Sequence, residues 1–159
     1  MTTTEVARRI TTSSPQETEN LGRRLGERLE PGVSVGLVGP LGAGKTQFVK
    51  GVARGNAGGT SCDVTSPTFT LIHEYAGKLT LYHLDSYRLA GPKEMKALGL
   101  DELVRSDSAV VVEWADRVRS VMPLDTLWIS FAVVGDTARE LQFEAGGSLA
   151  AATLARMSA

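Results

Sequence analysis

Leucines at every fourth position, from Leu21 to Leu29, form the clearest helical pattern in the first part of the chain. Side chains four residues apart lie on one face of an α-helix, so this spacing predicts an amphipathic helix. Ser14 is a suitable N-cap, and Pro15 fits the first helical position, where no backbone donor is needed. Pro31 and the glycine after it predict where the helix ends.

Two continuous apolar runs, at residues 33–38 and 109–114, predict buried β-strands. The second run, AVVVEW, lacks the alternation of apolar and polar positions that marks a strand with one wet face. We therefore expect it to be a central parallel strand, buried on both faces. A helix should follow the first strand, from Lys45 to the glycines of GNAGG.

Strand-like segments also occur in pairs separated by short turns. We predict two hairpins, the first from residues 68–75 and 78–85 and the second from residues 126–134 and 139–145. Gly77 and Gly135 lie in their turns. Residues 92–106 should be helical in two pieces, interrupted at Gly99.

The composition is that of an ordinary globular protein, with 42% apolar and 22% charged residues. Seventeen Lys and Arg residues against 18 Asp and Glu give no strong field to attract a polyanion, so nucleic acid would need a local patch or a partner subunit. The single cysteine, Cys62, excludes an internal disulfide and fits a reducing compartment. The N-terminus lacks the apolar core of a secretory signal, and no run approaches the roughly 18 apolar residues of a membrane span. We expect a cytoplasmic protein that does not contact a membrane.

Residues 39–46, GPLGAGKT, match the phosphate-loop motif G-x-x-x-x-G-K-[ST] in full. Glycines let the backbone curl so that several N–H groups point at one anion, and the next helix directs its positive end at the phosphates. Lys45 should reach the β- and γ-phosphates, and the Thr46 hydroxyl should bind Mg²⁺. The residues expected to hold the nucleotide here are Gly39, Leu41, Gly42, Ala43, Gly44, Lys45, Thr46 and Gln47.

This loop lies between an apolar strand and a helix, and strands alternate with helices along the chain. We therefore predict an α/β fold of the P-loop NTPase type, a mixed β-sheet flanked by helices in a single domain of residues 1–159. The Ala-rich tail after about residue 146 fits either a short helix or a frayed end.

A P-loop enzyme also needs a carboxylate opposite Thr46, and two acidic residues end predicted strands. LTLYHLD, which ends at Asp85, alternates and suits a strand with one wetter face. AVVVE is continuously apolar and suits a central strand, so we favour Glu113 as the metal-side carboxylate. Asp85 would then support the site or position the attacking water. The simpler alternative for either acid is a solvated strand end.

The nucleotide is expected to be ATP, because neither asparagine begins the Asn-Lys-x-Asp motif that reads guanine. No Arg-rich lid suggests a small-molecule kinase, and the chain is short for a ring-forming ATPase. Thr65, Ser66 and Thr68 surround Pro67 directly before a strand, where their hydroxyls could order against a γ-phosphate and Mg²⁺. The same residues could equally form a polar turn.

Five stretches occur together in one order: GPLGAGKT, TSPTFTL, YHLDSYRL, LGLDEL and VVVEWADRV. In this combination, over roughly residues 14–139, the chain resembles the TsaE family, the ATPase subunit that serves threonylcarbamoyladenosine (t6A) formation in bacterial tRNA. The resemblance implies binding and hydrolysis of ATP with Mg²⁺ in an assembly with TsaB and TsaD. TsaD would transfer the threonylcarbamoyl group to an adenosine next to the anticodon, so this chain would meet tRNA only through the complex.

The resemblance also implies roles for single residues. Lys45 and Thr46 would hold phosphate and Mg²⁺, Glu113 would be the second metal-side carboxylate, and Lys45, Asp85 and Glu113 would form the catalytic set. Arg139 matches a position near the nucleotide, and Ser14 and Pro15 would lie beside the base. The first switch would be Thr65, Ser66, Pro67, Thr68 and Phe69, and the second His83, Asp85, Tyr87 and Arg88. A nucleotide-sensing module without essential hydrolysis and a small-molecule kinase remain the alternatives.

Overall fold

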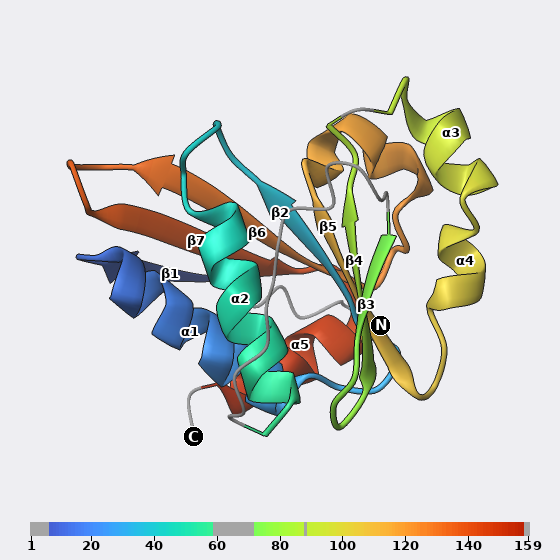
Figure 1. Ribbon diagram of the computed structural model, residues 1–159, viewed down its shortest axis with the longest axis horizontal. Coiled ribbons are helices and arrows are strands. Elements are labelled where there is room, and N and C mark those ends of the chain that lie inside the picture. The colour runs from blue at the N-terminus through green and yellow to red at the C-terminus, as the bar shows by residue number, and fades with distance from the viewer. Residues whose placement is uncertain (1–6, 59–71, 88, 158–159) are drawn as a thin grey trace.

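A seven-stranded β-sheet forms the centre of the protein, whose computed structural model describes residues 7–58, 72–87 and 89–157 (Figure 1). The strand order is β1-β7-β6-β2-β5-β4-β3. The strands are β1 (Ala7–Thr12), β2 (Ser34–Val38), β3 (Ile72–Tyr75), β4 (Thr80–Asp85), β5 (Ser108–Glu113), β6 (Thr126–Val133) and β7 (Arg139–Ala145).

The four inner strands, β6, β2, β5 and β4, are parallel, while β7, β1 and β3 extend the two edges by antiparallel pairing. Every residue of β5 is buried, which confirms the prediction of a central parallel strand. Because the inner strands are parallel, their carboxyl ends meet at one edge of the sheet, where α/β proteins place their ligands.

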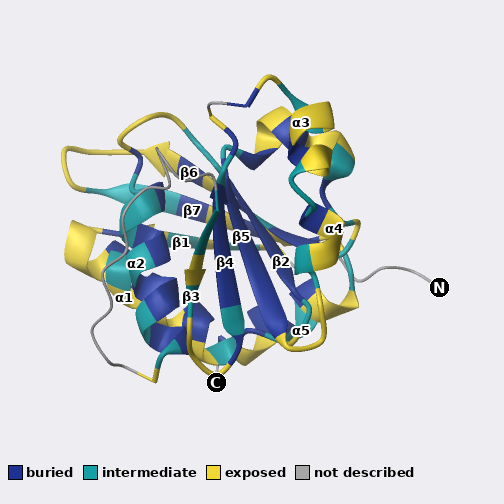
Figure 2. Ribbon diagram, turned by 45° about the vertical axis from the view of Figure 1, so that its right-hand side comes forward, coloured by how far each residue is buried: buried dark blue, intermediate teal, exposed yellow. Residues whose placement is uncertain are grey.

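Helices cover both faces of the sheet and are α1 (Pro15–Arg28), α2 (Lys45–Asn56), α3 (Pro92–Ala97), α4 (Leu100–Leu103), the 3₁₀ helix η1 (Ala115–Val121) and α5 (Ser148–Arg156). One apolar core joins the sheet to α1, α2 and α5, and a second joins it to α3, α4 and η1. Side chains of β5 alternate between the two cores, Val111 entering the first and Val112 the second. Figure 2 shows β2, β4 and β5 buried between these layers. The mixed α/β fold predicted from the sequence is confirmed.

Several local predictions are confirmed in detail. The Ser14 hydroxyl caps α1 by accepting a hydrogen bond from the Glu17 N–H at 3.1 Å, and Pro15 is the first helical residue. The break between α3 and α4 falls at Gly99, whose φ of 87° lies in the left-handed region that glycine tolerates. The tail after residue 146 contains a helix, α5, which settles the two alternatives left for it.

Two features differ from the sequence-based expectations. The pattern of residues 7–12 did not predict β1, an edge strand that, among the strands the structure describes, pairs with β7 alone. The expectation that β4 has one wetter face was also wrong, because residues 81–84 are all buried. β4 is an inner strand with β3 on its outer edge, and the two apolar cores cover its faces. Residues 68–71 of the predicted first hairpin lie outside the described part of the chain.

The helices α1 and α2 pack through glycines so closely that their backbones touch. A Cβ atom added at Gly51 of α2 would lie 1.9 Å from the carbonyl oxygen of Glu19, and one at Gly22 of α1 would lie 2.1 Å from that of Phe48. Gly26 and Gly55 make equally close approaches. The residues in contact rise in number together along α1 and α2. The two helices therefore run parallel, and both begin at the same edge of the sheet.

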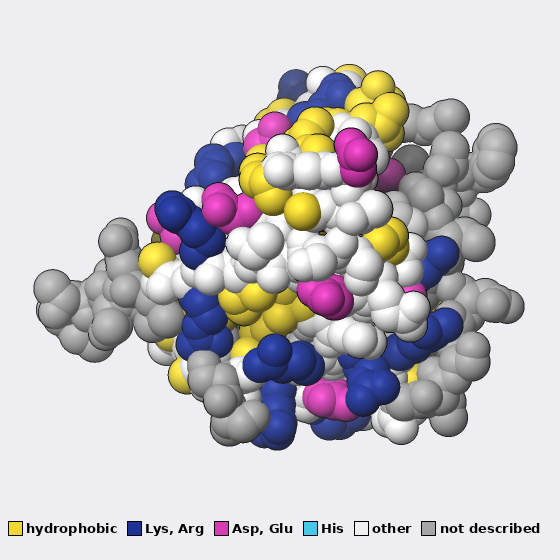
Figure 3. Space-filling view, turned by 90° about the vertical axis from the view of Figure 1, so that its left-hand side faces the viewer, with side chains coloured by type: hydrophobic (Ala, Val, Ile, Leu, Met, Phe, Trp, Pro, Cys, Tyr) yellow, Lys and Arg dark blue, Asp and Glu magenta, His cyan; other side chains and the backbone are white. Residues whose placement is uncertain are grey.

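Charged side chains of both signs are mixed on the surface. Figure 3 shows one face, on which Lys and Arg side chains gather toward the lower part with Asp and Glu side chains among them. Ion pairs join Arg54 to Glu19 and Arg23 to Glu27. In the part of the chain that the structure describes, none of the helices has the length and apolar character needed to cross a membrane.

Candidate nucleotide-binding site

A pocket of about 380 Å³ lies at the edge of the sheet where the inner strands end. This volume is within the usual range for small-molecule sites. Of the residues predicted for the site, the pocket wall includes Pro15, Leu41, Gly42, Ala43, Gly44, Lys45, Thr46, Gln47, Asp85, Glu113 and Arg139. Ser14 and Gly39 do not line it; Ser14 caps α1, and the carbonyl of Gly39 accepts a hydrogen bond from Lys45.

The loop between β2 and α2 has the backbone form that the glycines of its motif require. Gly42 and Gly44 have φ angles of 79° and 99°, in the left-handed region where other residues are strained. Gly44 is also the N-cap of α2, so the first turn of that helix directs its unpaired N–H groups toward the pocket. Because α1 runs parallel to α2 and its Pro15 lines the same pocket, two positive helix ends face this space.

The Lys45 side chain folds back on the phosphate loop. Its Nζ donates to the carbonyl oxygens of Gly39 at 2.6 Å and Pro40 at 3.0 Å, and it lies 3.9 Å from the centre of the Trp114 ring. Burial lowers the pKa of Lys45 from its ordinary value of 10.5, and the charge of Glu113 is the largest opposing effect. A buried cation held this way is available to any anion that can replace its carbonyl partners.

Thr46 and Glu113 meet across the pocket floor, although they are 67 residues apart in the sequence. The Thr46 Oγ1 lies 3.3 Å from Oε1 and 3.5 Å from Oε2 of Glu113. Neighbouring ligands of one octahedral Mg²⁺ are about 2.9 Å apart and opposite ligands about 4.1 Å, given Mg–O distances of about 2.0–2.1 Å. The observed separation lies between these two values, so one magnesium ion could contact both side chains, and hydroxyl and carboxylate oxygens suit that ion.

The second group of predicted switch residues occupies both the interior and the surface. His83 is fully buried in β4, and its Nε2 lies 2.6 Å from Oε2 of Glu113. Asp85 ends β4 directly beside Glu113 in the sheet register, and its Oδ1 accepts a hydrogen bond from the Tyr87 N–H. Tyr87 is 52% exposed, and its ring centre is 4.9 Å from that of Trp114. Arg88 and the whole predicted first switch, Thr65, Ser66, Pro67, Thr68 and Phe69, lie outside the described residues.

Arg139 connects the last hairpin to the phosphate loop. Its Nη2 donates to the Gly42 carbonyl at 3.2 Å, and its Nη1 donates to the carbonyls of Gly135 and Ala138. The hairpin turn is tied to the start of α1, because the Thr137 hydroxyl donates to the Ser13 carbonyl at 2.7 Å. The turn and the start of α1 thus form one continuous wall of the pocket.

Four residues of the pocket wall were not predicted: Thr18, Trp114, Asp136 and Thr137. Trp114 was interpreted as a packing residue, yet it is half-buried, has a left-handed φ of 58° and stands between Lys45 and Tyr87. Its place directly after Glu113 was the available signal. Asp136 and Thr137 belong to the turn just before Arg139, and Thr18 lies one helical turn beyond Ser14, so nearby predicted residues could have indicated all three.

Comparison with known proteins agrees with the resemblance of the motifs. A family model described as "Threonylcarbamoyl adenosine biosynthesis protein TsaE" matches residues 12–141. A protein of Treponema pallidum (strain Nichols), named tRNA threonylcarbamoyladenosine biosynthesis protein TsaE, is 45% identical over 133 residues, covering 84% of this chain and 97% of the relative. A protein of the same name from Bacillus subtilis (strain 168) is 41% identical over 138 residues, covering 86% of this chain and 85% of the relative.

The fold gives an independent comparison. The crystal structure of Bacillus subtilis YdiB superimposes with a TM-score of 0.83 and 34% sequence identity, covering 99% of this chain and 97% of that one. The likeness thus extends over both the sequence and the whole arrangement of helices and strands. Together, the family model, the identity to its named members and the shared fold show that the chain belongs to the TsaE family.

Proposed function

We propose that the protein is a Mg²⁺-dependent ATPase that drives turnover of a TsaB–TsaD complex during t6A modification of tRNA. The observation that carries the proposal is the approach of the Thr46 hydroxyl to the Glu113 carboxylate, 3.3 Å apart at the end of the phosphate loop. The family name and the names of the relatives support the link to tRNA modification. The proposal places the protein in the cytoplasm, with tRNA reached through its partners.

Positive groups of the pocket would bind the phosphates, and oxygen atoms would bind the metal. Backbone N–H groups of the phosphate loop and the start of α2 bind phosphate oxygens, and the Lys45 ammonium turns from the carbonyls of Gly39 and Pro40 to the phosphates. Thr46 and Glu113 hold the metal. When bound, Mg²⁺ supplies positive charge that offsets the negative charge on the phosphates as the bond to the γ-phosphate breaks.

Asp85 is the residue that we assign to the attacking water. It lines the pocket beside Glu113, at the end of the neighbouring parallel strand. Glu113 already receives hydrogen bonds from Thr46 and His83, which suits a metal ligand better than a group that must orient water. Arg139 holds the Gly42 carbonyl and so keeps the loop in its phosphate-binding form.

The test is ATP turnover with and without TsaB and TsaD, together with t6A formation in a reconstituted reaction. Thr46→Ala and Glu113→Ala should each reduce turnover by at least about tenfold, since each removes a metal-side oxygen. Glu74→Ala is the matched control, because this exposed glutamate lies on edge strand β3 away from the pocket. Undiminished turnover in both site variants would overturn the proposal, and turnover that needs an added metabolite would indicate a kinase instead.

A second candidate is a nucleotide-sensing interaction module, in which binding alone matters. It is favoured by one observation: both pocket carboxylates already accept hydrogen bonds within the protein, Glu113 from His83 and Asp85 from Tyr87. These bonds occupy part of the accepting capacity of each carboxylate, which favours a role in binding over one as a base for water. This candidate predicts that a non-hydrolysable ATP analogue supports repeated rounds of tRNA modification as well as ATP does, whereas the ATPase proposal predicts that modification stops after the first round.

A further inference from the structure

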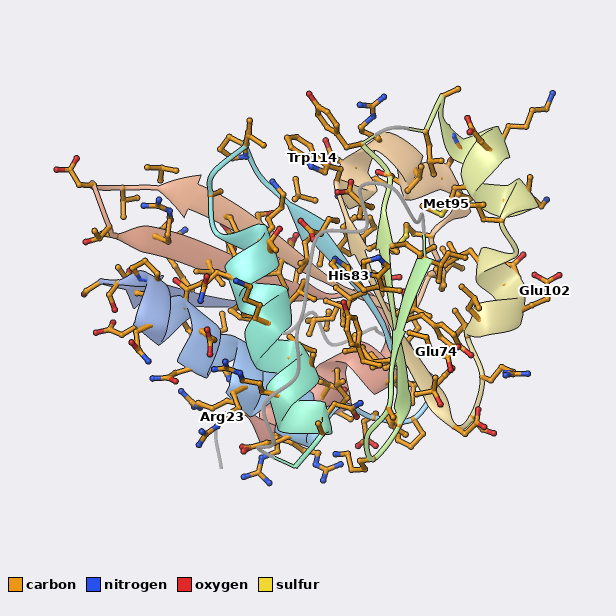
Figure 4. All side chains as sticks on the ribbon, viewed as in Figure 1. Arg23, Glu74, His83, Met95, Glu102 and Trp114 are labelled. Atoms are coloured by element: carbon orange, nitrogen blue, oxygen red, sulfur yellow. The ribbon has the colours of Figure 1, made fainter. Side chains whose placement is uncertain are left out.

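His83 is a fully buried polar side chain in an inner strand of the sheet. Its side chain is 0% exposed and projects from β4 (Figure 4) on the face opposite to that of Tyr82 and Leu84, its neighbours in the strand. A histidine buried at this depth must have its ring nitrogens satisfied or lose the hydrogen bonds that water would give it. Its burial therefore calls for a specific partner.

The partner is the metal-side carboxylate. His83 Nε2 and Glu113 Oε2 are 2.6 Å apart, and the Glu113 side chain is 3% exposed. Because a carboxylate can only accept, the hydrogen of this short bond belongs to Nε2. Among the described residues, the other ring nitrogen, Nδ1, has no hydrogen-bond partner. The polar chemistry of His83 is thus directed at one oxygen of Glu113.

The bond determines where the other carboxylate oxygen lies. With Oε2 held by His83, Oε1 is left 3.3 Å from the Thr46 hydroxyl. Without the bond, the Glu113 carboxylate would be held only by packing and by the longer contacts of the Thr46 hydroxyl, at 3.3 and 3.5 Å, so the spacing between the two metal-side oxygens would be less closely fixed. Partners behind a metal ligand orient it and raise its affinity in many proteins.

We propose that His83 is a positioning residue that holds the Glu113 carboxylate ready to bind Mg²⁺ together with Thr46. This inference rests on the proposed function, because it requires a metal at that place. It also differs from the switch role that the family resemblance implies for His83. His83 then affects the affinity for Mg²⁺, whereas binding of the nucleotide without a metal depends on the phosphate loop.

Two substitutions of similar size and polarity separate positioning from packing. In His83→Gln the side-chain amide nitrogen can take the place of Nε2 and donate to Glu113. In His83→Asn the amide nitrogen corresponds to Nδ1 and falls short of the carboxylate. The matched control is His73→Asn, since His73 lies directly opposite His83 in the register of β3 and β4 and bonds to the Tyr75 hydroxyl instead.

The experiment measures Mn²⁺ affinity by electron paramagnetic resonance, on the full chain bound to a non-hydrolysable ATP analogue. Binding of the same analogue in EDTA is measured alongside. We expect His83→Asn to weaken Mn²⁺ binding by about 10- to 100-fold, with His83→Gln and His73→Asn within about threefold of the wild type. Analogue binding in EDTA should be unchanged in all three variants, and excess Mg²⁺ should restore ATP turnover to His83→Asn.

Wild-type Mn²⁺ affinity in His83→Asn would overturn the inference, as would equal losses in His83→Asn and His83→Gln. Loss of analogue binding in EDTA in both His83 variants would make His83 a structural residue and would also overturn it. Failure of the wild-type protein to bind Mn²⁺ with the nucleotide would instead overturn the proposed function. The two failures are therefore distinguishable in one set of titrations.

Discussion

The two halves of the pocket hold their binding groups by different means. On the proposed phosphate side the binding groups are backbone atoms of residues 39–46 together with the Lys45 ammonium, supported by two helices in backbone contact. On the proposed metal side they are the side chains of Thr46 and Glu113, with His83 bonded behind Glu113, and the three residues come from elements far apart in the sequence. A backbone site depends on the path of a short segment, whereas a side-chain site depends on the sheet that brings its members together. The first should therefore be sensitive to added volume, and the second to lost hydrogen bonds.

The largest expected effect concerns the support of the phosphate side. Gly51→Ala should destabilise the protein by about 3 kcal/mol or more, because the new methyl group would overlap the Glu19 carbonyl and separate α1 from α2. Urea unfolding measures this change. Ala155→Gly, at an exposed position of α5, is the control and should cost about 1 kcal/mol from helix propensity alone. Equal losses in the two variants would mean that the helices are not in backbone contact.

Lys45 tests whether the phosphate side works without the metal side. Lys45→Met should lower kcat/KM for ATP by at least about 100-fold, since it removes the side-chain cation of the phosphate loop. It should also weaken nucleotide binding in EDTA, unlike His83→Asn. Nucleotide titrations with and without Mg²⁺ check this. A Lys45→Met variant that loses affinity only when Mg²⁺ is present would remove the distinction between the two halves.

Arg139 should have a smaller effect on the same side. Arg139→Met removes the hydrogen bond to the Gly42 carbonyl and should weaken nucleotide binding by on the order of 1 kcal/mol. The control is Arg9→Met, which removes an exposed ion pair with Glu140 on the neighbouring strand. Calorimetric titration compares nucleotide binding by the two variants. An equally large loss of affinity in Arg9→Met would show that the effect comes from removing a positive charge anywhere on the protein.

The smallest and most gradual effect is a pH dependence of stability without nucleotide. Burial lowers the pKa of Lys45 in the folded protein below 10.5, so between that lowered pKa and 10.5 the unfolded chain binds more protons. The free energy of unfolding contributed by Lys45 therefore rises with pH in this window. In urea titrations at increasing alkaline pH, the free energy of unfolding of the wild type should rise relative to that of Lys45→Met. A constant difference between the two proteins would contradict the lowered pKa.

The features that could be predicted from the sequence are those that depend on a short segment of the chain. Local signals were sufficient for the phosphate loop, the Ser14 cap and the break at Gly99, because each depends on a few adjacent residues. The continuous apolar character of residues 109–113 correctly indicated an inner strand, and Glu113 was correctly preferred by pattern as the acid near Thr46. Whether it binds a metal stays a prediction.

Features that depend on pairing between distant segments were not predicted. β1 forms by pairing with β7, and its short alternating pattern is a weak signal by itself. The buried state of β4 depends on its place between β5 and β3, which no local pattern of apolar residues specifies. The bond from His83 to Glu113 spans 30 residues and two strands. The glycines of α1 and α2 show their purpose only when the two helices are placed together.

The backbone contact between α1 and α2 has a consequence for how the pocket opens. Because the backbones of these helices touch at the glycines, sliding of one helix past the other would disrupt close packing, and we expect Pro15 and Lys45 to keep a constant separation. We then expect changes of shape on ligand entry and exit at the opposite side of the pocket, where Trp114 lines the wall and Tyr87 packs against it. A partner that responds to whether the pocket is occupied is therefore expected to contact the side formed by Trp114 and Tyr87.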